Sequence, residues 1–252
     1  MAYAVLGTYR IYDIANKSQK MMLSASNMPM PHHGSDHADG TTVLLLPAFK
    51  YIDNVTPATT SALIEHCIST APTNTTPLIP KSETHTATTE SEGQAPPGIP
   101  QSIPNLPDNF TMRDCPHAYL VLLCSQGTRD ARCGQSAPLL RKEFERQLRP
   151  LGLYRDLDDE RPGGVGIYFI SHVGGHKFSA NCMIYRRGSK DRESVDATGV
   201  PNDEAAQCIW LARVRPEDCE NLVRFTILQG KVVKPERQLR GGFDRSKKLV
   251  SW

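Results

Sequence analysis

The feature that most constrains the fold is a break in composition after Thr70. From there to Asn109 the chain consists largely of Thr, Ser and Pro, and it holds 8 of the 19 prolines. Such a segment buries too little apolar surface to offset the conformational entropy that is lost when a chain becomes ordered. The sequence therefore predicts a disordered linker over residues 70–110, with a folded part on either side.

The part before the linker, residues 1–69, predicts a small α/β front domain. Residues 3–12 and 41–52 are rich in apolar side chains and are typical of strands. Residues 59–69 repeat apolar side chains at helical spacing, which predicts a short helix.

The part after the linker, residues 111–235, predicts a compact α/β domain. Residues 117–124 form a continuous apolar run, typical of a strand that is covered on both faces. A helix is expected next, with Ser136 as its N-cap and Pro138 in its first turn. Three strands and a closing helix follow, and this order matches a thioredoxin-like sandwich. Residues 236–252 are expected to be a basic tail.

Composition and the chain's first residues exclude several classes of protein. The formal net charge of +2 lacks the basic excess of a nucleic-acid binder. No apolar run reaches the roughly 20 residues that cross a bilayer. The amino-terminal residues match neither a secretion signal nor a transit peptide, so we expect a cytoplasmic protein, with the nucleus as a second location and the mitochondrial matrix less favoured. Seven cysteines in that reducing compartment do not predict a disulfide framework.

Two loops at strand ends each carry a pair of metal-binding side chains: Cys124 with Cys133, and His172 with His176. Gly174 and Gly175 lie between the histidines and favour a tight loop rather than a helix. If the two strands are neighbours, the two loops meet. The four side chains could then hold zinc or an iron–sulfur cluster.

The spacing of the cysteines bears on that choice. Structural zinc sites usually have paired cysteines two to four residues apart, whereas eight residues between thiols suit a bulkier two-iron cluster. Further contacts to such a cluster are expected from Ser125, Arg129, Arg132, Gly174 and Gly175. A zinc-stabilised interaction module and a thiol oxidoreductase that acts through Cys124 or Cys133 stay open as alternatives.

Cys115 and His117 are weighed as spare ligands, but small buried core residues are the better interpretation. The carboxylates near residue 160 are typical of an exposed acidic turn, so a glycoside hydrolase is not expected: Asp156, Asp158, Asp159 and Glu160.

The segments LLCSQGTRDARCG (122–134) and SHVGGHKFSANCMIY (171–185) strongly resemble the sucrase/ferredoxin-like family of fungi and plants (Apd1/Aim32 type). The likeness continues through residues 209–223 and 230–242, and it includes LSASNMPMP and LLLPAFKYI in the first part. It implies a thioredoxin-like [2Fe–2S] protein whose ligands are Cys124, Cys133, His172 and His176. It also implies a longer front domain, so residues 1–69 are expected to be incomplete.

The resemblance implies that the protein transfers single electrons or senses the redox state, with a role in redox homeostasis. An electron carrier is expected rather than a stand-alone enzyme. Two neutral imidazoles in place of two thiolates remove negative charge, so the reduction potential is expected well above the roughly −400 mV of plant-type ferredoxins. Trp252 ends the chain like the tails recognised by the cytosolic iron–sulfur assembly machinery. The targeting complex of that machinery is therefore an expected partner, and a redox partner of unknown identity is expected as well. Binding to nucleic acid or to a membrane is not expected.

Overall fold

The computed structural model describes residues 2–9, 20–29, 40–78, 110–171, 178–188 and 204–251. Their helices are α1 (Thr60–Ala62), α2 (Ala131–Leu148), α3 (Cys219–Asn221) and α4 (Pro235–Gln238). The strands of the first half are β1 (Ala2–Tyr9), β2 (Lys20–Ser26), β3 (Thr41–Leu46), β4 (Lys50–Val55) and β5 (Thr111–Asp114). Those of the second half are β6 (Tyr119–Cys124), β7 (Tyr154–Arg155), β8 (Val165–Ile170), β9 (Cys182–Arg187), β10 (Ala205–Leu211), β11 (Leu239–Asp244) and β12 (Leu249–Ser251).

These strands form one mixed sheet that runs through both halves of the chain. Its order is β12-β11-β10-β9-β6-β8-β2-β1-β3-β4-β5, and β7 pairs with the side of β8. In the second half β6 and β8 are parallel, whereas β9 is antiparallel to β6 and β10 is antiparallel to β9. The halves join where Ser26 of β2 pairs with Ile170 of β8. The chain is therefore a mixed α/β protein, as predicted.

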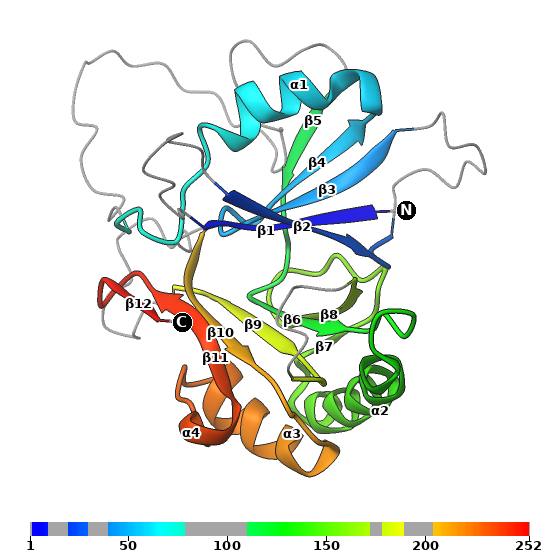
Figure 1. The fold of residues 1–252 in the computed structure, drawn as a ribbon, viewed down its shortest axis with the longest axis vertical. Coiled ribbons are helices and arrows are strands. Elements are labelled where there is room, and N and C mark those ends of the chain that lie inside the picture. Colours follow the sequence, from blue (N-terminus) through cyan, green and yellow to red (C-terminus); the bar gives the residue numbers. More distant parts are fainter. Residues whose placement is uncertain are drawn as a thin grey trace, which may run out of the picture.

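Two helices cover one face of β6, β8, β9 and β10 (Figure 1). The first is α2, and the second is α3 with the π-helical turn Leu222–Ile227 that continues it. Val121 and Leu123 of β6 face these helices and are fully buried. No helix in the described ranges is both long and apolar enough to cross a bilayer.

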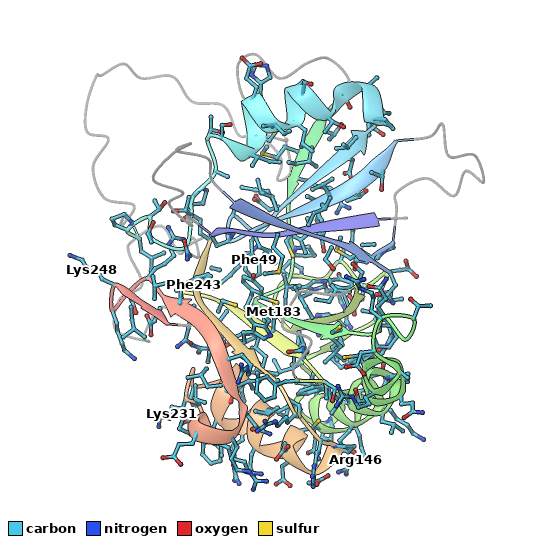
Figure 2. The ribbon with its side chains drawn as sticks, viewed as in Figure 1. Phe49, Arg146, Met183, Lys231, Phe243 and Lys248 are labelled. Atoms are coloured by element: carbon cyan, nitrogen blue, oxygen red, sulfur yellow. The ribbon has the colours of Figure 1, made fainter. Side chains whose placement is uncertain are left out.

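The first half of the sheet curls over the opposite face of β6 and β8. Side chains from both halves form one apolar core here: Leu44, Leu46, Phe49 and Tyr51 pack with Leu120, Leu122, Tyr168, Met183, Tyr185 and Phe243. Figure 2 labels Phe49, Met183 and Phe243 in the middle of the molecule. Because both halves contribute fully buried residues, neither half keeps this core without the other.

The outer face of the first half is covered by α1 and the π-helical segment Leu63–Ile68, which continues it. Leu63, Cys67 and Ile68 are buried there, at the helical spacing that the sequence predicted. Strand β5, which the sequence analysis placed in the second domain, pairs with β4 and so belongs to this half.

Several expected boundaries differ from the structure. Residues 239–251 form β11 and β12 at the edge of the sheet instead of a surface tail. Gly242 makes this possible, because a Cβ atom there would lie 2.1 Å from the carbonyl oxygen of Cys208 on β10. Strand β2 was missed. The expected linker is described only at its ends, and residues 79–109 lie outside the described ranges.

Residues 70–78, at the start of that expected linker, pack against the second half through Arg245. The side chain of Arg245 is 1% exposed. It donates hydrogen bonds to the carbonyl oxygens of Thr76 (2.7 Å), Pro77 (3.3 Å) and Ala205 (3.0 Å) and to the Glu204 carboxylate (2.7 Å). One buried cation thus fixes a segment that composition alone predicts to be disordered.

Replacing Arg245 by methionine is expected to lower the free energy of unfolding by about 2–3 kcal/mol, because the buried carbonyl group of Ala205 and the partly buried ones of Thr76 and Pro77 lose their donor. Urea denaturation of the full chain measures this loss. The control is Arg237→Met, at an exposed position of α4, which should change stability by less than about 0.5 kcal/mol. Equal stability of the two variants would contradict the role assigned to Arg245.

Candidate metal centre

Cys124 is the last residue of β6, and its backbone is held from both sides. It lies opposite Ile170 in the parallel register with β8. Its amide donates to the carbonyl oxygen of Asn181 at 3.0 Å, and the next amide, of Ser125, donates to the carbonyl oxygen of Ile170 at 2.9 Å. The Cys124 side chain is 1% exposed. The strand therefore ends on a fixed, buried thiol.

Cys133 lies in the first turn of α2, and not in the loop where the sequence analysis placed it. The helix begins at Ala131 with Asp130 as its N-cap, five residues before the expected start near Ser136, so Pro138 is inside the helix. Asp130 is the N-cap instead of Ser136 because its carboxylate accepts a hydrogen bond from the amide of Arg132 at 3.0 Å, which satisfies one of the free amides at the start of the helix. Cys133 joins the buried stripe of α2 and is 1% exposed.

The short loop between the two cysteines is a hydrogen-bonded turn. The carbonyl oxygen of Gln126 accepts from the amides of Arg129 (3.2 Å) and Asp130 (3.1 Å). Both oxygens of Asp130 also accept from the Arg132 guanidinium, at 3.0 and 2.9 Å, and these bonds hold the pKa of the Asp130 carboxyl below its usual value. Asp130 thus forms its ion pair with Arg132, whereas Arg129 is exposed.

Two glycines let this turn lie directly on the start of α2. A Cβ atom at Gly134 would lie 2.8 Å from the Cα atom of Gly127, which is closer than such atoms approach. At Gly127 itself, a Cβ atom would lie 3.6 Å from Gly134, an ordinary contact. Gly134, next to Cys133, is therefore needed for the close approach of turn and helix.

The predicted histidine pair follows the end of β8 directly. His172, Gly174, Gly175 and His176 lie outside the described residues, as does Trp252. The chain on either side of residues 172–177 is described, and both flanks are anchored near Cys124.

On the amino-terminal side, Ser171 is bound to β2 of the first half. Its amide donates to the carbonyl oxygen of Ala25 at 2.8 Å, and its Oγ accepts from the Ala25 amide at 2.9 Å. Its Oγ also lies 2.9 Å from the Oγ of Ser24, which is buried. Since Ile170 pairs with Cys124, this anchor lies one residue beyond the cysteine's own strand partner.

On the carboxyl-terminal side, Asn181 connects the chain to Cys124. Its carbonyl accepts from the Cys124 amide, its Nδ2 donates to the carbonyl oxygen of Phe178 at 2.9 Å, and its Oδ1 accepts from Trp210 Nε1 at 3.2 Å. Asn181 is 3% exposed. Both flanks of residues 172–177 therefore reach the edge of the sheet where β6 ends.

All seven cysteines lie in described ranges, and all are thiols without a disulfide. Within those ranges, no three His, Cys, Asp or Glu side chains gather in a way that could hold a metal ion. Cys124 and Cys133 lie within those ranges and the two histidines do not, so the four-ligand prediction stays a prediction.

Cys115 and His117, weighed as spare ligands, lie at the opposite end of β6, roughly 20 Å along the strand from Cys124. His117 Nε2 lies 2.9 Å from Tyr168 Oη, which lies 3.2 Å from Tyr51 Oη, and Cys115 Sγ lies 3.6 Å from Tyr51 Oη. Burial lowers the pKa of His117 to about 4, so the ring is neutral at pH 7. These two residues belong to a separate buried network.

Comparison with known proteins places the chain. The family model described as "Sucrase/ferredoxin-like" matches residues 6–241, which is most of the sequence. The chain belongs to the sucrase/ferredoxin-like family. This membership confirms the resemblance found in the sequence, and it covers both halves of the sheet. No solved structure matches the chain significantly.

Among curated relatives in this family, "Actin patches distal protein 1" of Saccharomyces cerevisiae is 44% identical over 108 residues, which are 43% of this chain and 29% of that protein. "Altered inheritance of mitochondria protein 32" is 36% identical over 118 residues in Clavispora lusitaniae and 32% over 115 residues in Debaryomyces hansenii. These matches cover 47% and 46% of this chain and 33% of each relative. The chain thus spans about a third of the length of these relatives.

Substituting Gly134 by alanine is expected to lower the free energy of unfolding by about 1–3 kcal/mol, because the new methyl group forces the backbone of the turn away from α2. Helix propensity alone predicts a gain of about 1 kcal/mol instead. Urea denaturation decides the sign. Gly127→Ala is the matched control, since its methyl group fits, and a loss equal to that of Gly134→Ala would refute the close approach.

Proposed function

We propose that this chain holds a [2Fe–2S] cluster through Cys124, Cys133, His172 and His176, and that it transfers or senses single electrons. The observation that carries the proposal is the position of both thiols, which are buried and lie at the junction between β6 and α2. Cys124 ends β6, Cys133 lies in the first turn of the helix that follows, and both are buried. Membership of the sucrase/ferredoxin-like family supports the same assignment.

The flanks of residues 172–177 support the inclusion of the histidines. Ser171 follows the strand partner of Cys124, and Asn181 accepts a hydrogen bond from Cys124 itself. A chain spans at most about 3.6 Å per residue. In the sequence His172 directly follows Ser171 and His176 is two residues before Phe178, so each proposed ligand is separated by few residues from a described anchor.

The surroundings of the thiols fit a cluster that needs thiolates. Cys133 lies at the amino-terminal end of an 18-residue helix, where the helix dipole favours negative charge. The neighbouring Arg132 guanidinium is paired with the Asp130 carboxylate, so the helix N-terminus is the source of positive field that remains. When bound, the cluster would supply a one-electron couple, while the chain supplies burial, two thiolate ligands and a field that offsets their charge.

The topology of the second half supports a thioredoxin-like assignment of this domain. The strands run in the order β10-β9-β6-β8, with one parallel pair, and the two helices lie on one face. This agrees with the order of strand, helix, strand, strand, strand, helix in the sequence, and it places the start of α2 beside the end of β6.

A thiol oxidoreductase is less well supported than a cluster. An attacking thiolate must reach the disulfide of another molecule, and reactive cysteines are therefore partly exposed. Cys124 and Cys133 are each 1% exposed. A zinc-stabilised module that uses the same four ligands is separated from the cluster by colour, because zinc proteins are colourless.

Alanine at Cys124, Cys133, His172 or His176 is expected to abolish or shift the visible absorption and the EPR signal of anaerobically purified protein, because each change removes one cluster ligand. The matched controls are Cys67→Ala and His66→Ala in the helical segment of the first half, which should leave both spectra unchanged. A colourless parent protein that contains zinc would contradict the proposal.

Replacing both histidines by cysteine is expected to lower the reduction potential towards the roughly −400 mV of four-thiolate plant-type ferredoxins. Two neutral ligands then become two anionic ones, so adding an electron costs more. Potentiometry followed by EPR measures the change. If the potential of the double variant equalled that of the parent, the histidines would not be ligands.

A further inference from the structure

A group of one aromatic and two cationic side chains lies beside the candidate centre, outside the four proposed ligands. Phe178 is the first described residue after 172–177 and is half-buried. The guanidinium carbon of Arg213 lies 4.2 Å from the centre of its ring, and that of Arg240 lies 3.6 Å from it. We call Phe178, Arg213 and Arg240 the Phe178 surface.

The two arginines of the Phe178 surface come from different parts of the sheet. Arg213 lies just beyond β10 and is exposed, and its amide donates to the carbonyl oxygen of Ser179 at 2.8 Å. Arg240 lies in β11, which pairs with β10, and is partly exposed. Across the described part of the chain, neither guanidinium makes an ion pair with a carboxylate; both are instead stacked on Phe178.

Stacking on a ring leaves the guanidinium N–H groups available. Arginine held flat on an aromatic face loses little further rotamer freedom when it binds a carboxylate, and its N–H groups match that group in pairs. An acidic surface that contacts both guanidinium groups is attracted by both positive charges. The Phe178 surface is therefore suited to carboxylates from another molecule.

A short chain of hydrogen bonds joins the Phe178 surface to Cys124. The carbonyl oxygen of Phe178 accepts from Asn181 Nδ2, and the carbonyl oxygen of Asn181 accepts from the Cys124 amide. Trp210 fixes the Asn181 side chain by donating to its Oδ1. The cationic surface is thus linked to the proposed cluster ligand through one buried residue.

We infer that the Phe178 surface is the docking site for an acidic redox protein, whose carboxylates bind Arg213 and Arg240. The inference rests on the proposed function and names the class of its partner. If the four proposed ligands hold a cluster, it would give up one electron and the oxidised one-electron centre of the partner would take up that electron, so that loss and gain balance. The reverse transfer uses the same contact.

The test is the binding of an acidic haem protein, cytochrome b5, to the full chain, measured by isothermal titration calorimetry at low salt. Arg213→Glu with Arg240→Glu should raise Kd by about tenfold or more, because attraction at the contact becomes repulsion. Arg213→Gln with Arg240→Gln, which removes the charges without reversing them, should give a smaller increase. Raising the salt concentration should reduce the difference between parent and variants.

The matched control carries the same change in net charge at another place. Arg149 stacks on Tyr154 at the far end of α2, and Arg224 stacks on Phe225. Arg149→Glu with Arg224→Glu should leave Kd within about twofold of the parent. If both pairs of glutamate substitutions weakened binding equally, only net charge would matter and the docking site would be overturned. If neither pair changed Kd, the docking site would also be overturned.

The absorption spectrum of the same samples separates the two proposals. Calorimetry does not depend on a cluster, whereas the spectrum reports it directly. A parent protein with a cluster spectrum and no change of Kd in the Arg213 and Arg240 variants overturns the docking site alone. A parent protein without that spectrum overturns the proposed function, and with it the redox role of the surface.

Discussion

The parallel pairing of β6 with β8 is the constraint on which the candidate centre depends. It brings the end of β6 next to the end of β8, although 45 residues separate Ser125 from the carbonyl that it binds. A shift of this pairing by one residue would turn Cys124 to the other face of the sheet. The fully apolar sequence of β6, buried on both sides, selects the register through packing with α2 on one face and the first half on the other.

The sequence allowed much of the second half to be predicted, because its signals are local. A continuous apolar run located β6, and the predicted order of helix, three strands and closing helix agrees with the elements that follow it. The start of α2 was predicted five residues late, since Ser136 and Pro138 form a familiar start signal. Asp130 is an equally good N-cap by residue type, and only the turn at Gln126 shows that it is the one used. Cys133 was consequently assigned to a loop.

What the sequence did not predict are features that depend on distant pairing. Strand β2 has a mixed composition and becomes a strand because β1 and β8 lie on its two sides. Strand β11 contains two glycines, which are unfavourable in isolated strands, yet Gly242 is required for its contact with Cys208. Arg245 orders a Thr- and Pro-rich segment through contacts 168 and 169 residues away in the chain. Local sequence patterns do not identify partners that are this distant in the chain.

The clamp of Ser24 and Ala25 on Ser171 has a mechanical consequence. The first half of the protein holds the chain one residue before His172, through a pair of backbone and hydroxyl contacts. A displacement of β2 would therefore move Ser171 directly, because the contact between them does not involve the helices. A molecule that binds the first half at β2 would therefore act on Ser171, next to the proposed ligand His172.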